Sequence, residues 1–115
     1  MNIALFGRHP SPAEHIVFPE GIPQDKMNDY SWMESQCVGW LQQIDESDFE
    51  KCEWYGFIVR LYVEGFTPAL ISFLKAWEVC YGNNLDNLAR TYNHPMLHLM
   101  HYQPDGTYDS QKWQR

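Results

Sequence analysis

Three histidines near the end of the chain have a spacing that could bind a metal ion. On a helix, His94, His98 and His101 would share one face, and three imidazoles that leave one coordination position open form a catalytic zinc site. Pro95 disfavours helical backbone at His94. On a strand, His98 and His101 would point to opposite faces and could not share an ion. We therefore expect no metal and no other cofactor, and a metal-dependent hydrolase at these histidines is the alternative.

A second candidate for chemistry is the pair Arg8-His9, which follows the first predicted strand. Loops after strands often hold functional residues, and a histidine beside an arginine could act on a phosphate group. The phosphate-binding loop that would strengthen this hypothesis is missing, because only Gly7 stands here and no GxxxxGK[ST] motif occurs. We expect polar side chains of this turn to satisfy backbone groups. A phosphodiesterase-like activity of Arg8 and His9 belongs to the enzyme alternative.

Nucleophilic catalysis has weaker support in the sequence. No serine stands in a GxSxG motif, and no cysteine has a recognisable reactive environment. Cys37, Cys52 and Cys80 form no CxxC pair, and their odd number argues against a disulfide framework. They are better interpreted as buried thiols in a reducing compartment. We assign no catalytic residue and favour a protein that is not an enzyme.

The net charge of −7 is concentrated between Glu20 and Glu53, where nine carboxylates are accompanied by only two lysines. Asp25 and Asp29 stand near a predicted helix start, where negative charge is favourable. The densest group of carboxylates does not lie at the start of either of the two main predicted helices, so helix stabilisation does not account for it. It consists of Asp45, Glu46, Asp48, Glu50 and Glu53. We expect this group to contact a partner with a basic surface.

Aromatic side chains are interleaved with these acids. Tryptophan gives a large contact area at low entropic cost, so it is frequent at the centre of interfaces. Trp54 follows the dense acidic group directly, and Trp32 lies off the apolar stripe of the first predicted helix. We expect Trp54 and Trp32 to contribute to partner binding.

Together these patterns predict a small, acidic, non-enzymatic protein that blocks the basic, nucleic-acid-binding surface of a partner. Carboxylates spaced along a helix and its following connection could imitate a phosphate backbone. Phage anti-defence inhibitors and toxin-immunity proteins are of this size and charge. The expected partner is a basic protein or a nucleoprotein complex. A homo-oligomeric structural component is a further alternative to the hydrolase, and the oligomeric state is open.

Composition excludes several other classes of function. The eight lysines and arginines are scattered along the sequence, so we expect no direct contact with nucleic acid. The longest apolar run, residues 66–74, is too short to span a bilayer. The first residues show no secretory signal, so we expect a cytoplasmic location.

The elements that must position these residues alternate between strands and helices. Strands are predicted over 2–7 and 15–18 (an edge), 54–63 and 96–103, and helices over 28–44, 67–81 and, as a third short one, 85–92. The segment 8–27 is rich in proline and largely irregular, with one helical turn possible at Ser11. The turn at 104–106 leads into a hairpin, and the tail 110–115 has no anchor except Trp113.

We therefore expect an α+β fold in one compact domain, with a small mixed sheet of three to five strands packed against two main helices. The near-continuous apolar run of 54–63 predicts a central strand covered on both faces. The first helix has an apolar stripe of Tyr30, Met33, Cys37, Trp40, Leu41 and Ile44. The second has a stripe of Leu70, Phe73, Leu74, Trp77 and Tyr81, with Ser72, Lys75 and Val79 facing outward.

Overall fold

The computed structural model describes residues 1–44, 58–81 and 95–113. Within these ranges the chain forms five strands, two α-helices and one 3₁₀ turn. In chain order they are β1 (Asn2–Ala4), β2 (His15–Ile16), η1 (Gln24–Lys26), α1 (Tyr30–Gln42), β3 (Ile58–Tyr62), α3 (Thr67–Tyr81), β4 (Met96–Tyr102) and β5 (Tyr108–Trp113). The third predicted helix, at 85–92, and residues 54–57 of the predicted central strand lie outside the described residues.

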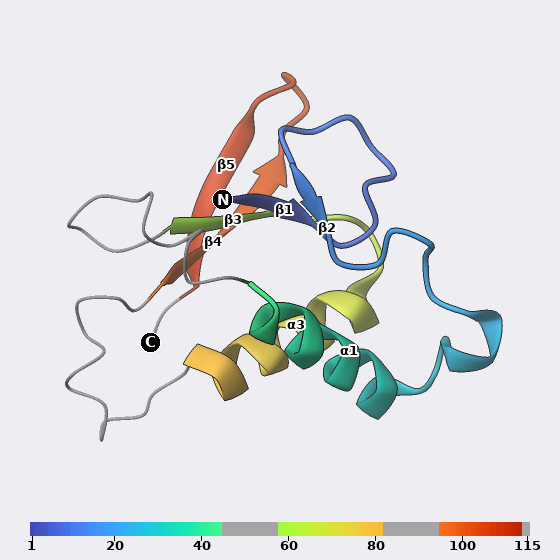
Figure 1. Ribbon diagram of the computed structural model, residues 1–115. Coiled ribbons are helices and arrows are strands. Elements are labelled where there is room, and N and C mark those ends of the chain that lie inside the picture. Colours follow the sequence, from blue (N-terminus) through green and yellow to red (C-terminus); the bar gives the residue numbers. More distant parts are fainter. Residues whose placement is uncertain (45–57, 82–94, 114–115) are drawn as a thin grey trace, which may run out of the picture.

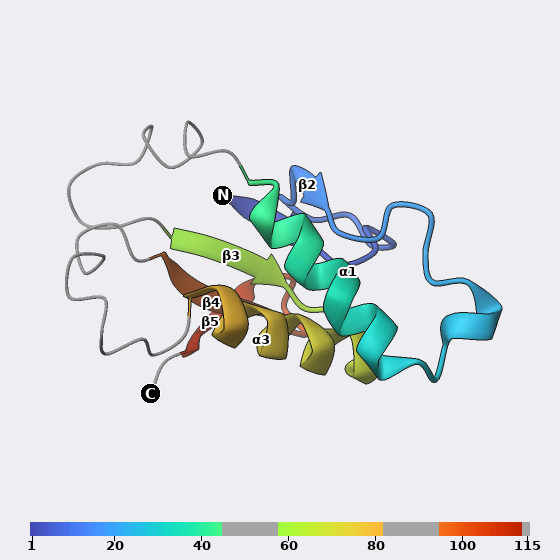
Figure 2. The same ribbon diagram turned by 60° about the horizontal axis from the view of Figure 1, so that its bottom comes forward.

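The described strands form one mixed sheet in the order β2-β1-β3-β4-β5. β1 pairs parallel with both β2 and β3, β3 pairs parallel with β4, and only β5 is antiparallel. The prediction that the third strand is central is confirmed. Figures 1 and 2 show α1 and α3 side by side on the same face of the sheet. The predicted α+β domain, with a small mixed sheet packed against two helices, is confirmed.

Local signals in the sequence explain where the helices begin. The Asp29 carboxylate accepts a hydrogen bond from the backbone N–H of Trp32 at 3.0 Å, which caps the first turn of α1. α3 begins at Thr67-Pro68 as predicted, because proline fits the first helical turn. Ser72 was predicted to face outward, but it is only 3% exposed. Its hydroxyl donates to the Pro68 carbonyl at 2.8 Å, so burial leaves no unsatisfied group.

The hydrophobic core lies between the sheet and the two helices. The strands contribute Ile3, Leu5, Val59, Leu61, Leu97 and Leu99, and the helices contribute Met33, Cys37, Leu41, Ala69, Phe73, Ala76 and Trp77. Burial, together with the nearby Glu34, raises the pKa of the Cys37 thiol to about 12. Cys80 is half-buried, and Cys52 lies outside the described residues. Tyr30, predicted in the core stripe, is 56% exposed because it is the first residue of α1, where the helix extends past the sheet (Figure 2).

One prediction about the sheet was wrong, and another stays a prediction. β3 was expected to be covered on both faces; both described helices lie on one face, and the other face of β3 carries the half-buried Arg60 and Tyr62, which is 7% exposed. The tail from Ser110 was expected to lack an anchor, but β5 pairs with β4 up to Leu97 and Trp113. Backbone pairing does not require apolar side chains, so a polar strand can hold here without an apolar signal in its sequence.

The segment between β1 and α1 is largely irregular, as predicted, apart from β2 and the short turn η1. The expected helical turn at Ser11 is absent. Instead the Ser11 hydroxyl oxygen accepts the backbone N–H of Ala13 at 3.2 Å, a local hydrogen bond that replaces a helical one. None of the described helices has the length and apolar character needed to cross a membrane.

Candidate functional site

Six of the seven predicted partner-binding residues lie outside the described residues, so their roles stay predictions. They are Asp45, Glu46, Asp48, Glu50, Glu53 and Trp54. Their flanking residues are described: Ile44 follows the end of α1, and Ile58 begins β3. Trp32 was expected to be exposed. It is half-buried and stacks on Phe18, with the ring centroids 6.3 Å apart, so much of its surface is already used for packing.

The two described histidines of the predicted metal set are held by different partners. His98 Nδ1 lies 2.9 Å from the Ser110 hydroxyl, and His101 Nε2 lies 2.9 Å from the Gln111 side-chain oxygen. Three residues apart on β4, the two side chains leave opposite faces of the sheet. Among the described residues no three histidines, cysteines or carboxylates are arranged to hold a metal ion. His94 lies outside the described residues.

Arg8 and His9 lie on the exposed loop that follows β1, but they have different surroundings. The Arg8 guanidinium lies over the Phe6 ring, with its carbon 4.8 Å from the ring centroid, a cation–π contact. His9 lines a pocket together with residues of β3, β4 and β5. Their predicted joint action on a phosphate group stays a prediction.

Glu64 fixes the loop that carries Arg8 and His9. Its carboxylate accepts three consecutive backbone N–H groups, those of Phe6, Gly7 and Arg8, each at 3.0 Å. Three N–H groups can converge on one carboxylate because Gly7 adopts a positive φ of 68°, which is costly for any other residue. The result is an anion-binding turn that is already occupied by the protein's own carboxylate.

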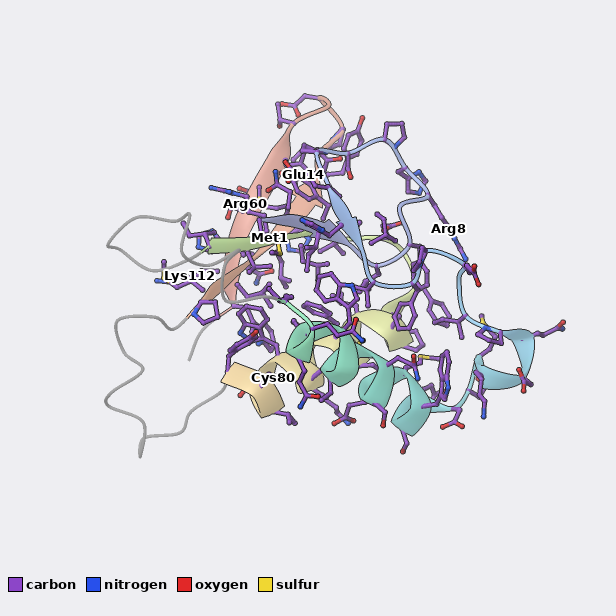
Figure 3. The ribbon with its side chains drawn as sticks, in the orientation of Figure 1. Met1, Arg8, Glu14, Arg60, Cys80 and Lys112 are labelled. Carbon is purple, nitrogen blue, oxygen red and sulfur yellow. The ribbon has the colours of Figure 1, made fainter. Side chains whose placement is uncertain are left out.

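The face of the sheet opposite the helices, which we call the open face, carries a row of basic side chains. Strand register places Arg60 of β3 beside His98 of β4, and His98 beside Lys112 of β5. Figure 3 shows Arg60 and Lys112 on the sheet, with Glu14 near Arg60 and with Arg8 at the other side of the molecule. Within the described part of the chain, neither Arg60 nor Lys112 forms an ion pair. Arg60, His98 and Lys112 are hereafter called the basic row.

The pKa of His98 reports the proximity of these charges. It is lowered from its ordinary value of 6.5 by partial burial and by the positive charges of Arg60 and Lys112. Near neutral pH, His98 is therefore a neutral imidazole between two cations. The five described strands hold no carboxylate at an open-face position, but Glu14, directly before β2, extends this row on the side of Arg60. Its backbone N–H donates to the Asn2 carbonyl at 2.8 Å, and Asn2 is the register partner of Arg60.

Beside the basic row, toward the carboxyl ends of β3 and β4, three tyrosines form a cluster. The Tyr108 ring meets Tyr62 edge-on at 4.9 Å and Tyr102 at 5.5 Å between centroids. Tyr62 is 7% exposed, whereas Tyr102 is 64% exposed. These rings and the loop after β1 enclose a pocket of about 410 Å³. Its polar lining comes from His9, Ser11 and Glu64 besides the tyrosines.

Sequence reasoning missed both the basic row and the tyrosine pocket. Arg60, His98 and Lys112 are separated by 38 and 14 positions, so no local pattern joins them. Only the parallel pairing of β3 with β4 and the hairpin of β4 with β5 bring them into register. One usable signal was the alternation of Tyr102 and His98 with the buried Leu97 and Leu99, which marks one face of β4 as polar.

Comparison of the chain with protein-family models, with curated proteins and with solved structures found no match.

Proposed function

We propose that this chain is a binding protein that holds a small anionic ligand on the open face of its sheet. The observation that carries the proposal is the basic row, in which Arg60, His98 and Lys112 stand on three adjacent strands in register. Adjacent strands lie about 4.8 Å apart, so the three side chains arise within about 10 Å of one another. Two permanent cations and an imidazole in one row, neither cation in an ion pair with the described residues, are complementary to a phosphate or a similar oxyanion.

The three side chains offer different contacts to an anion. Arg60 presents a planar guanidinium that can donate two parallel hydrogen bonds, while Lys112 contributes a mobile point charge. His98 Nδ1 is engaged with Ser110, so Nε2 is the ring nitrogen left to face a ligand. Arg60 is half-buried, which restricts its side chain and reduces the entropy lost on binding.

Calorimetry of the full chain with pyrophosphate tests this proposal. We expect salt-sensitive binding that weakens about 10- to 100-fold in Arg60→Ala, because a charge-assisted hydrogen bond contributes about 1.5–3 kcal/mol. Lys75→Ala on α3 is the matched control, since it removes one exposed positive charge from the helical layer. No binding of pyrophosphate, or equal losses in the two variants, would contradict the proposal.

A second candidate function is supported by the sequence: inhibition of a basic partner through the dense acidic group of residues 45–53. Its support is the concentration of nine carboxylates against two lysines between Glu20 and Glu53. The partner would be a basic protein or nucleoprotein complex in the cytoplasm, blocked as an anti-defence or immunity protein blocks its target. This surface and the open face need not exclude one another, because the residues that form them are different.

Charge reversal tests the second candidate. Changing Asp45, Glu46 and Asp48 to lysine should abolish capture of a basic partner from host lysate at low salt, while thermal stability changes little. The matched control reverses Asp105 and Asp109, exposed acids of the β4–β5 hairpin, and should capture the partner normally. Unaltered capture by the first variant would overturn this candidate.

A further inference from the structure

We infer that the anion held by the basic row is the phosphate of a nucleotide whose base occupies the tyrosine pocket. The inference rests on the proposed anion-binding function of the open face and adds the chemistry of the rest of the ligand. It depends on the arrangement of the basic row, the three tyrosines and Glu64, which lie on one continuous surface.

Distances along the strands match a ligand with two chemically different ends. Residues two apart on a strand lie about 6.6 Å apart on the same face, so Tyr62 is one step from Arg60. Tyr102 lies two steps, or about 13 Å, from His98 on β4. The surface between them is formed by Met100 and Ser110, which are paired in register. A ribose with one or two phosphates spans such a separation between an aromatic base and an oxyanion.

The tyrosine pocket has the features expected for a base. Its volume of about 410 Å³ lies within the range of small-ligand sites, which is about 300–1,000 Å³. Tyr102 is 64% exposed, so its ring is accessible for stacking, which contributes about 1–3 kcal/mol per base. His9 and Ser11 also line the pocket and are polar residues that could contact the base. Because every base has an aromatic face, stacking alone selects the class of ligand and not a particular base.

Glu64 sets the orientation of the ligand. Its carboxylate lines the pocket and already occupies the three backbone N–H groups of the turn after β1. A phosphate in the pocket would meet this negative charge, and the three N–H groups of the turn are already bonded to it. The phosphate therefore points along β3 and β4 toward the basic row, and the uncharged base lies in the pocket.

The number of charges favours a free nucleotide over a nucleic-acid strand. The basic row offers two permanent charges and one titratable group, against a net charge of −7 for the chain. A long polyanion would meet more repulsion than attraction, because binding to nucleic acid depends on many neutralised phosphates. A nucleotide with two phosphates needs only the contacts that the row provides.

Calorimetry with ADP, pyrophosphate, adenosine and a ten-nucleotide single-stranded DNA tests the inference on the full chain. We expect ADP to bind about tenfold more tightly than pyrophosphate, and adenosine to bind more weakly than either. Tyr102→Ala should remove the advantage of ADP while binding of pyrophosphate is unchanged, whereas Arg60→Ala should weaken both. Tyr102→Phe keeps the ring and should retain the advantage.

Tyr30→Ala is the matched control, because Tyr30 is a comparably exposed tyrosine on α1, 56% against 64%. It should bind ADP like the unaltered chain. If pyrophosphate does not bind, the proposed function fails. If pyrophosphate binds but ADP binds no more tightly, only the nucleotide inference fails. Tighter binding of the DNA than of ADP, or an equal loss of pyrophosphate in Tyr102→Ala, would also overturn the inference.

Discussion

The two faces of the sheet are made by the same strands, but neighbouring residues of β3 and β4 differ sharply in burial and charge between them. On β3, Leu61 is fully buried against the helices, while its neighbour Arg60 stands half-buried on the open face. On β4, Leu97 and Leu99 alternate in the same way with His98. The helix-covered face therefore holds the apolar burial that stabilises the fold, and the open face holds the groups suited to ligand contact. Stability and binding should be separable by mutation.

The largest expected effect compares two adjacent residues of β3. Leu61→Ala should lower the free energy of unfolding by about 2–5 kcal/mol, because it leaves a cavity in the core. Arg60→Ala should lower it by less than about 1 kcal/mol, because the Arg60 side chain forms no ion pair or hydrogen bond with other described residues. Urea unfolding of both variants measures the difference. Similar losses of unfolding free energy in the two variants would mean that Arg60 stabilises the fold as much as a core residue does. The contrast between the two faces would then be wrong.

An intermediate effect is expected at the junction between the open face and the loop after β1. Glu64→Ala should lower the free energy of unfolding by about 1–3 kcal/mol, because three backbone N–H groups lose a charged acceptor. Amide hydrogen exchange at Phe6, Gly7 and Arg8 should accelerate in the same variant.

Glu78→Ala on α3 is a suitable control for this variant, because it also removes one carboxylate, but one that accepts no hydrogen bond from the described residues. It should leave exchange at residues 6–8 unchanged. Slow exchange at these amides in Glu64→Ala would show that the turn holds without its carboxylate, and the orientation argued for the ligand would lose its basis.

The smallest expected effect is the pH dependence of His98. Its pKa in the folded protein lies below the ordinary 6.5, so the unfolded chain binds the proton more readily. His98 should therefore destabilise the fold as pH falls below about 6.5 and have no such effect above it. A bound phosphate would favour the imidazolium, so anion binding should instead tighten as pH falls.

NMR titration of the His98 ring measures this shift directly. Arg60→Ala and Lys112→Ala should each move the pKa upward, toward 6.5, because each removes a neighbouring positive charge. Lys75→Ala should leave it unchanged, since Lys75 lies on α3 and is not among the charges that lower this pKa. An unchanged pKa in Arg60→Ala would show that the basic row does not act as one electrostatic unit.

Much of the fold followed from local patterns in the sequence. The helix over 67–81, the central position of the third strand and the final hairpin match the prediction, because periodicity, a Thr-Pro helix start and a Pro-Asp-Gly turn are local signals. Periodicity did not identify Ser72 as buried or Tyr30 as exposed. Those outcomes depend on a hydrogen bond to Pro68 and on how far α1 extends past the sheet.

The candidate site was much less predictable. The sequence directed attention to the crowded acids of 45–53 and to histidines close in sequence. The basic row escaped notice because its members come from three different elements. The basic residues are scattered along the sequence, which argued against direct contact with nucleic acid, but strand pairing brings two of them into one row on the sheet.

The sequence by itself determined the helices, most of the strands, the acidic charge and its concentration between Glu20 and Glu53, because each depends on residues close together in the chain. Tertiary structure alone decided which residues meet on the open face. The register of β3, β4 and β5 aligns Arg60, His98 and Lys112, and Glu64 closes a turn 56 to 58 positions away. The residues of one strand do not by themselves specify which strand it pairs with. A surface that spans several strands can therefore be recognised only once their pairing and register are known.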